Sequence, residues 1–192
     1  IDMHQVYDLL PLLAMSIASD IVPITGENRI LAFYGLRTIN AKPSVGLRAI
    51  MKVAGIEDRN ITISDLVYKI GPRINASGRM KSGAEAVRLL ITDKEEEALQ
   101  YAQEINTYNQ DRRDYDIRTT DEALAQLEAD PQNRQKHTTV VYSSEWHKGV
   151  VGIAASRLTE DYYRPTIVLT DSENGMVGGS ARSVSDFDIY QA

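Results

Sequence analysis

The spacing of apolar positions changes along the chain, and the change predicts two kinds of structure. Through the first half, apolar residues recur every three or four positions, which is the spacing of a helix with one buried face. Gly and Pro signals separate these stretches, and Pro11 is expected to kink the first of them. The predicted helices cover residues 5–19, 27–40, 44–54, 62–70 and 83–91. This part of the chain is therefore expected to be mainly helical.

Cap residues mark the ends of two of these helices. Ser44 is a predicted N-cap, and Gly55 is the predicted stop of the same helix. Thr62 and Asp65, three positions apart, resemble a capping box at the start of the next helix. The Gly71-Pro72 pair is expected to end that helix, because proline lacks a backbone donor and disfavours helical backbone in the residue before it.

A longer helix is predicted over residues 93–129, where the sequence contains neither Gly nor Pro. At about 1.5 Å per residue it would be about 55 Å long, enough to connect two domains. Its narrow and mostly apolar stripe comprises Ala98, Tyr101, Ile105, Tyr108, Arg112 and Tyr115. We interpret it as a solvated amphipathic connector without chemistry of its own.

Beyond Pro131 the spacing becomes that of strands. Strands are predicted at 138–143, 166–170 and 176–182, with a helix at 149–161. Because that helix joins the first two strands, they are expected to run parallel. The predicted fold class is α/β, with a mainly helical part (1–92), a connecting helix (93–131) and a small α/β part (132–192).

Composition narrows the classes of function. The 192 residues are 43% hydrophobic, which is typical of a globular protein, and none is cysteine. Any metal must then be held by carboxylates or imidazoles, which favours Mg²⁺ or Mn²⁺. No apolar run approaches the roughly 20 residues of a membrane span, so a cytoplasmic location is expected. The net charge of −6 argues against a protein that coats nucleic acids, but residues 93–131 carry most of the excess acid. The two flanks can therefore accept an anion.

Two glycine- and arginine-containing segments suit phosphate groups. Gly71–Arg79 is expected to be a loop, because glycines let successive N–H groups face one point while arginines bind phosphate oxygens in pairs. Gly178–Ser183 has a similar composition and is expected at a strand end, where a bulge or an edge turn is the alternative.

A third segment joins a predicted strand to a predicted helix. It contains Trp146, His147, Lys148 and Gly149, and the N-terminus of the helix can bind a phosphate. A tight turn built for packing is the alternative. Trp146 either stacks on a base or belongs to the core. Asp20 follows the first helix, and as a single carboxylate it is either a surface residue or one ligand among several.

Together these segments resemble the RecJ family of single-strand DNA exonucleases, within the DHH phosphoesterase superfamily. The resemblance rests on four segments in the family's order, Ala18–Arg29, Gly71–Arg79, Trp146–Gly152 and Gly179–Ser183. It implies the C-terminal, mainly helical part of a DHH domain, a long connecting helix, and a truncated DHH-associated domain. The two domains would face each other across a cleft for single-stranded DNA.

The resemblance also implies an activity and roles for individual residues. The enzyme would be a metal-dependent 5′–3′ exonuclease of DNA repair and recombination that uses Mn²⁺ or Mg²⁺, with single-strand-binding protein and a helicase as partners. Asp20 would be a metal ligand, and Arg73, Asn75, Arg79 and His147 would be catalytic. The residues that would bind substrate are Gly78, Trp146, Gly149, Ser180, Arg182 and Ser183.

Some of the family's motifs do not occur in this sequence, notably the Asp-His-His signature and a late Gly-Gly-His element. We therefore expect the sequence to be an internal part of a longer enzyme, inactive alone because most metal ligands are missing, and unable to retain the metal. Two alternatives remain open. One is another DHH phosphoesterase acting on short oligonucleotides, cyclic dinucleotides or pyrophosphate, and the other is a non-catalytic nucleic-acid-binding module.

Overall fold

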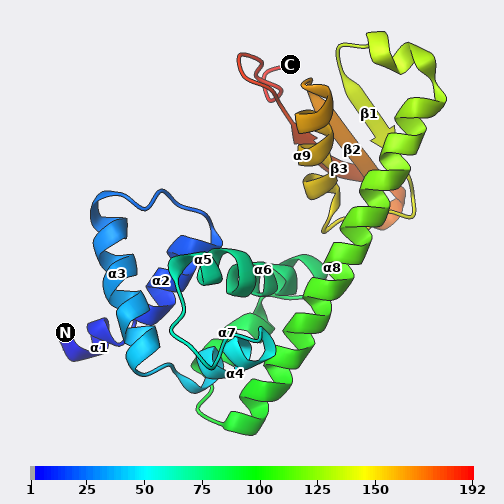
Figure 1. Cartoon of the computed structure of the whole chain (residues 1–192). Coiled ribbons are helices and arrows are strands. Elements are labelled where there is room, and N and C mark those ends of the chain that lie inside the picture. The colour runs from blue at the N-terminus through cyan, green and yellow to red at the C-terminus, as the bar shows by residue number, and fades with distance from the viewer. Residues whose placement is uncertain (1–2) are drawn as a thin grey trace. The chain divides into compact units, whose positions relative to one another are not determined.

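Helices make up most of the structure, as the spacing of apolar residues predicts. The computed structural model describes residues 3–192, apart from the side chains of His4, Arg134 and Asn174. The chain divides into two units, residues 1–110 and residues 111–192. The helices of the first unit are α1 (Met3–Tyr7), α2 (Leu10–Ser19), α3 (Gly26–Ala41), α4 (Val45–Val53), α5 (Ile63–Asp65), the π-helix η1 (Leu66–Ile70), α6 (Gly71–Met80) and α7 (Ala84–Ile91) (Figure 1). Helix α8 (Glu95–Ala129) begins in the first unit and ends in the second.

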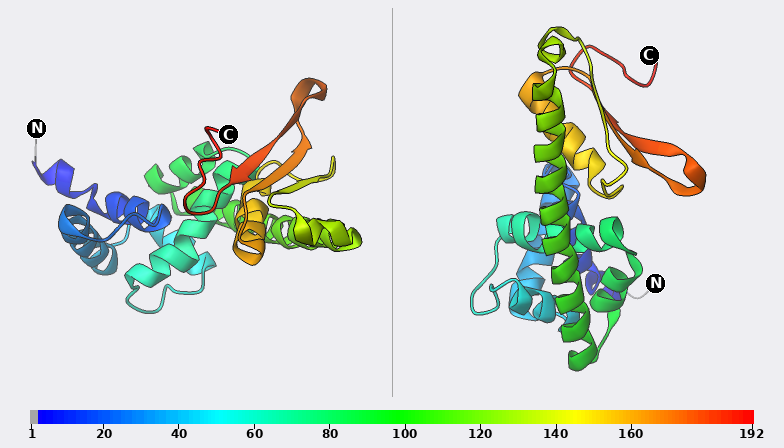
Figure 2. Two further views of the ribbon diagram at one scale, coloured as in Figure 1. Left: turned by 90° about the horizontal axis from the view of Figure 1, so that it is seen from above. Right: turned by 90° about the vertical axis from the view of Figure 1, so that its right-hand side faces the viewer.

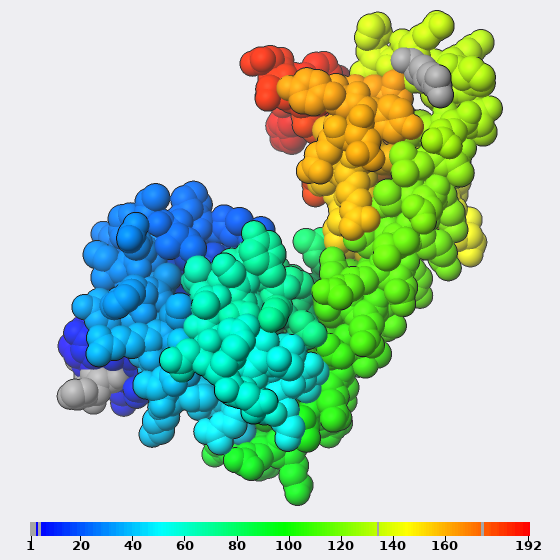
Figure 3. Space-filling model, viewed as in Figure 1, coloured from blue at the N-terminus to red at the C-terminus, as the bar shows by residue number. Residues whose placement is uncertain are grey.

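An apolar core holds the helices of the first unit together. Its largest fully buried side chains are Ile39, Leu47, Ile50, Leu66, Ile70, Leu89 and Ile105. Side chains of α3 cover one flank of this unit in the space-filling view (Figure 3). The predicted helices at 27–40, 44–54 and 83–91 are confirmed to within two residues at each end.

The predicted caps are confirmed by their hydrogen bonds. The Ser44 side chain accepts from the Leu47 N–H at 3.3 Å and begins α4. Gly55 follows the end of α4 with a φ of +68°, a conformation that glycine adopts at little cost. The Thr62 hydroxyl accepts from the Asp65 N–H, and the Asp65 carboxylate accepts from the Thr62 N–H, which together form a capping box.

Pro11 lies in the first turn of a helix, and the single helix predicted over residues 5–19 is interrupted before this proline instead of being kinked at it. Helix α1 ends at Tyr7, and α2 begins at Leu10 with Pro11 in its first turn. An N–H in the first turn has no partner within the helix, so a proline there removes nothing and its fixed φ suits the helix.

The predicted break at Gly71-Pro72 is also wrong, because the chain stays helical from Ile63 to Met80. The π-helix η1 lies immediately before the proline, and the Gly71 N–H bonds to the Leu66 carbonyl five residues back. This wider turn lets the helix pass the residue that cannot donate. Gly71 is needed for packing, since a Cβ there would lie 3.0 Å from the Cα of Ser19 on α2.

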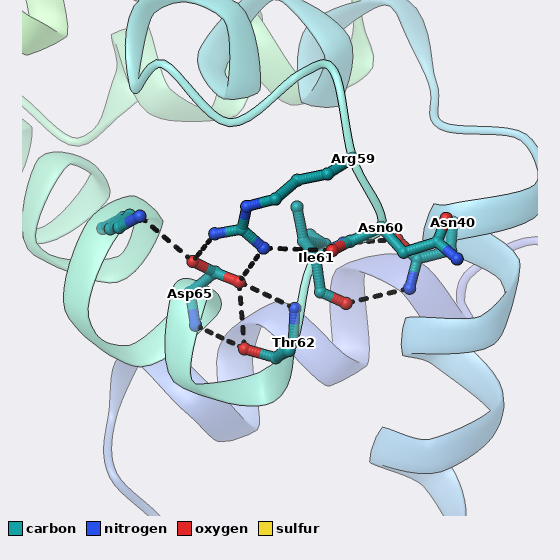
Figure 4. Close-up of polar contacts among 7 residues, drawn as sticks. Asn40, Arg59, Asn60, Ile61, Thr62 and Asp65 are labelled. Atoms are coloured by element: carbon teal, nitrogen blue, oxygen red, sulfur yellow. Dashed lines mark hydrogen bonds and ion pairs between the residues drawn. The ribbon is translucent and has the colours of Figure 1, made fainter.

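A polar cluster fixes the start of this continuous helix (Figure 4). The buried Asp65 carboxylate accepts two bonds from the Arg59 guanidinium, at 2.6 and 2.9 Å, and lies 3.3 Å from Lys69 Nζ. The hydrogen bond from Arg59 holds the pKa of Asp65 well below its usual range. The Asn40 side chain bonds to both the N–H and the carbonyl of Ile61, which attaches the preceding loop to α3.

The second unit is a small sheet with helices on one side. Its elements are the end of α8, the 3₁₀ turn η2 (Pro131–Gln135), β1 (Thr139–Tyr142), α9 (Val151–Tyr162), β2 (Thr166–Asp171), the 3₁₀ turn η3 (Glu173–Gly175) and β3 (Val177–Arg182). The strand order is β1-β2-β3, with β1 and β2 parallel as predicted and β3 antiparallel to β2. Helix α9 packs against β2 and β3 (Figure 2).

Helix α8 contributes to both cores. Ala98, Ala102 and Ile105 are fully buried in the first, while Ala123 and Leu127 are buried in the second. The predicted long helix and the first part of its apolar stripe are therefore confirmed. Within residues 3–192, no helix has the length and apolar character needed to cross a membrane.

Candidate phosphate-binding sites

The predicted Gly71–Arg79 loop is helix α6, and this changes where its polar side chains lie. Residues two apart on a helix lie on roughly opposite sides, whereas residues four apart share a face. Arg73 donates from Nε to the Asn106 side chain of α8 at 3.0 Å and from Nη1 to the Lys69 carbonyl. Asn75 instead donates to the Ser19 carbonyl of α2, also at 3.0 Å. Arg73 therefore lies on a different face from Asn75 and Arg79, so the three do not surround one point.

Asp20 and Asn75 line one pocket of the first unit. Asp20 lies at the C-terminal end of α2 and is exposed. The pocket has a volume of about 320 Å³ and is lined by Leu12, Met15, Ser16, Ser19, Asp20, Ile74, Asn75, Val87, Leu90 and Ile91. The close approach of α6 and α2 at Gly71 brings the two polar residues together. The order of residues alone did not predict that pairing.

These residues do not make a metal centre by themselves. A divalent ion such as Mg²⁺ needs about six oxygen ligands, whereas the pocket supplies the single carboxylate of Asp20. Among the residues that the structure describes, no group of three or more His, Cys, Asp or Glu side chains could hold a metal ion. The assignment of Asp20 as a metal ligand therefore stays a prediction.

Gly78 and Arg79 lie near the C-terminal end of α6, and both are exposed. Arg79 is four residues after Asn75 and Gly78 is seven after Gly71, so the helical spacing places each on the same side of α6 as the earlier residue. A Cβ on Gly78 would have no atom within 4 Å. Nothing in the packing therefore requires glycine at this position.

This contrast yields a test of the helical assignment. Gly78→Ala should raise the free energy of unfolding by about 0.5–1 kcal/mol, because alanine favours an exposed helix interior over glycine. Gly71→Ala, the matched change at the other end of α6, should lower it, since the new Cβ would crowd Ser19 and Leu66. Urea unfolding followed by far-UV circular dichroism measures both. A loss of stability in Gly78→Ala would contradict a helix at this position.

In the second unit, Ser180 and Arg182 lie two apart on β3 and face the start of α9. Arg182 donates from Nη1 to the Ser180 hydroxyl at 2.9 Å and from Nε to the Ser156 hydroxyl of α9 at 3.0 Å. A Cβ on Gly152 would lie 3.1 Å from Ser180 Oγ and 3.2 Å from Arg182 Nη2. The guanidinium and the hydroxyl therefore lie over the first turn of α9. The strand predicted over 176–182 is confirmed as β3, which includes Gly178–Arg182.

The N-terminus of α9 makes this cluster suitable for an anion. The N-cap position is Val150, which has no side-chain oxygen to accept from the first N–H groups. Free N–H groups and the helix dipole favour negative charge at this end. Ser183 lies just beyond β3, and its hydroxyl donates to the Phe187 carbonyl.

His147 lies in the turn that leads into α9. Its Nδ1 accepts a hydrogen bond from the Gly149 N–H at 3.0 Å, so Gly149 orients the imidazole. The neutral ring then carries its proton on Nε2. Burial of the imidazole, and secondly the charge of Lys148, lower the pKa of His147. The side chain is therefore neutral near pH 7 and can donate from Nε2.

Trp146 is a core residue, which confirms the second of the two alternatives and argues against its assignment to substrate binding. Only 3% of the residue is exposed, and it packs with Val141, Leu158 and Val168. The indole N–H donates to Glu122 of α8 at 2.7 Å. A buried ring with a satisfied donor offers no face to a nucleobase.

Gly152 and Ser156 are residues of this cluster that the sequence prediction missed. Both face β3 from α9. The available signal was the presence of two small residues four positions apart, because that spacing places them on one face of a helix. Their partner strand could not be assigned from the sequence, because the signal does not state which element packs on that face.

Known proteins resemble this chain over nearly its whole length. The DHHA1 domain family matches residues 135–192. The single-stranded-DNA-specific exonuclease RecJ of Bacillus subtilis is 36% identical over 96% of this chain, and that of Escherichia coli is also 36% identical over 96%. The chain is therefore similar to RecJ exonucleases over nearly its whole length. A crystal structure of RecJ from Thermus thermophilus in complex with Mg²⁺ superposes with a TM-score of 0.81 at 30% identity, over 96% of this chain and 28% of that one.

A second RecJ structure, bound to manganese, superposes with a TM-score of 0.80 at 28% identity, over 96% of this chain and 45% of that one. The chain spans only 23% of the length of the Bacillus subtilis RecJ and 33% of the Escherichia coli RecJ. The DHHA1 match includes His147, Ser180 and Arg182, whereas the pocket with Asp20 and Asn75 lies outside it.

Proposed function

We propose that this chain is the part of a RecJ-type exonuclease that binds the sugar–phosphate backbone of single-stranded DNA through a site in the second unit. The observation that carries the proposal is the position of Arg182 and Ser180 over the first turn of α9, at Gly152. Arginine, hydroxyl and helix N-terminus are three groups that each bind phosphate oxygens. Their convergence on one turn suits a single phosphate of the strand.

His147 adds a neutral donor in the segment that leads into α9. His147 is three residues before Val150, the N-cap of α9. The imidazole and the first N–H groups of α9 therefore belong to the same short stretch of chain. A neutral Nε2–H can bond to a phosphate oxygen without the cost of charging a half-buried ring. We propose that it contacts a neighbouring phosphate.

The first unit would contribute to catalysis through Asp20, Asn75 and Arg79. Asp20 would be one of several ligands of the Mn²⁺ or Mg²⁺ that polarises the phosphodiester and activates water in the intact enzyme. Asn75 holds the end of α2, and so the carboxylate, against α6. Arg79 would stabilise negative charge on the phosphate. The role of Arg73 would be to hold α6 on α8 through Asn106.

The proposal predicts salt-sensitive binding without cleavage. A fluorescent oligothymidylate should bind this chain with an affinity that falls as salt rises, with a slope of about −0.7 per phosphate neutralised. The oligonucleotide should remain uncut in the presence of Mn²⁺, because a single carboxylate ligand cannot hold the metal. Fluorescence anisotropy and a denaturing gel measure the two outcomes.

Three results would redirect the assignment. Affinity that does not depend on salt would argue against a phosphate site. Preference for a dinucleotide or pyrophosphate over a longer strand would favour another kind of DHH phosphoesterase. Absence of nuclease activity from the intact protein, with strand binding retained, would favour a binding module.

A further inference from the structure

One face of α8 contacts the turn that carries His147. Tyr115 stacks on the His147 ring, with centroids 5.3 Å apart and planes at 30°. Arg118 donates to the Glu145 carbonyl at 3.4 Å, and its guanidinium lies 5.5 Å from the Tyr115 ring. Each contact lies within residues 111–192, so all of them belong to the second unit.

Two further residues of α8 extend this face. Glu122 accepts from the Trp146 indole N–H at 2.7 Å. Gln126 donates to the Tyr142 carbonyl at the end of β1, at 3.0 Å. Positions 115, 118, 122 and 126 are three or four residues apart, which places them along one side of the helix. The segment from β1 to α9 is thus attached to α8 at four successive helical turns.

We propose that this face of α8 positions His147, with Tyr115 setting the plane of the imidazole. The proposal rests on the proposed function only in taking phosphate as the ligand of His147. Helix α8 is then a positioning element of the DNA site as well as a connector.

Two contacts direct the Nε2–H donor of His147. Gly149 holds Nδ1 through its N–H, which fixes one edge of the imidazole. Stacking on Tyr115 then restricts rotation about the remaining side-chain bond, so Nε2 points in one direction. Trp146, anchored in the core by Glu122, holds the backbone of the preceding residue.

Tyr115→Leu and Tyr115→Phe make a matched test. Leucine fills part of the space without a ring, whereas phenylalanine retains the stacking surface. The imidazole ¹⁵N–¹H spectrum of the whole chain reports the tautomer and environment of His147, with His147→Gln as the assignment control. We expect Tyr115→Phe to keep the His147 signals and the affinity for oligothymidylate. Tyr115→Leu should shift the signals and weaken binding about two- to tenfold, as expected for loss of one aromatic pair.

The outcomes separate this proposal from the proposed function. Unchanged His147 signals in Tyr115→Leu would overturn the positioning role, whatever the affinity. Shifted His147 signals in Tyr115→Leu would support the positioning role. If the affinity were also unchanged, both in Tyr115→Leu and in His147→Gln, the result would count against His147 as a phosphate contact. If Tyr115→Leu does not fold, Arg118→Gln provides the second test, because the Arg118 side chain is 52% exposed and its loss should leave the core intact. A shift of the His147 signals in that variant supports the proposal, and no shift overturns it.

Discussion

Replacing Arg182 with alanine is expected to weaken the binding of single-stranded DNA by about 10- to 100-fold, the loss typical of a charged hydrogen-bonding group. Arg182 holds Ser180 and Ser156 in place through two hydrogen bonds, so its removal also releases the hydroxyls of the site. The slope of affinity against salt should become shallower by about 0.7, the contribution of one phosphate of a single strand. Fluorescence anisotropy at several salt concentrations measures both quantities.

Arg37→Ala is the matched control for this change. Arg37 is an exposed arginine of α3 in the first unit, so the control removes the same charge away from the proposed site. Thermal unfolding followed through Trp146, the single tryptophan of the chain, checks that the second unit remains folded. Equal affinities of Arg182→Ala and Arg37→Ala would contradict the phosphate site at the start of α9.

The second large effect is expected for stability, in Asp65→Asn. Asparagine can still accept from the Thr62 N–H, but it loses the charged bonds to Arg59 and the ion pair with Lys69. We expect a loss of about 2–3 kcal/mol, below the range for a fully buried pair because the Arg59 side chain is 48% exposed. Urea unfolding followed by far-UV circular dichroism measures the loss, with the exposed Asp58→Asn on the same loop as control.

The difference in unfolding free energy between wild type and Asp65→Asn should depend on pH in a definite direction. Because Arg59 lowers the pKa of Asp65 in the folded chain, the carboxylate stabilises the fold above the pKa of the unfolded state, about 4. That stabilisation is lost as the pH falls through the folded-state pKa. The difference between wild type and Asp65→Asn should therefore be full at pH 7 and shrink below about pH 4. A difference that stayed constant down to pH 3 would contradict the ion pair.

Local features were predictable wherever neighbouring residues decide the structure. Ser44, Gly55 and the Thr62–Asp65 capping box act through hydrogen bonds or backbone freedom within a few residues, and all three were predicted correctly. The α8 helix was predictable for a similar reason, since it lacks Gly and Pro over 35 residues. The parallel pairing of β1 and β2 follows from the helix between them.

The error at Gly71-Pro72 has a different cause. Composition gave this segment the properties of a loop, but packing of Gly71 on Ser19 and the π turn before the proline favour a helix. The two glycines of this segment lie in different surroundings: Gly71 is packed closely against α2, whereas Gly78 lies on an open surface. Only contacts with α2 distinguish the two positions.

The sequence by itself determined most of the helices, the three strands, the caps at Ser44, Gly55 and Thr62, and the family resemblance. Each of these depends on residues close together in the chain. The tertiary structure decided which side chains meet. It separated Arg73 from Asn75, buried Trp146, and brought Arg182 to Gly152 across 30 residues of sequence. The physical reason is that the face a helix or strand presents is fixed by the packing of distant elements, which local propensity does not specify.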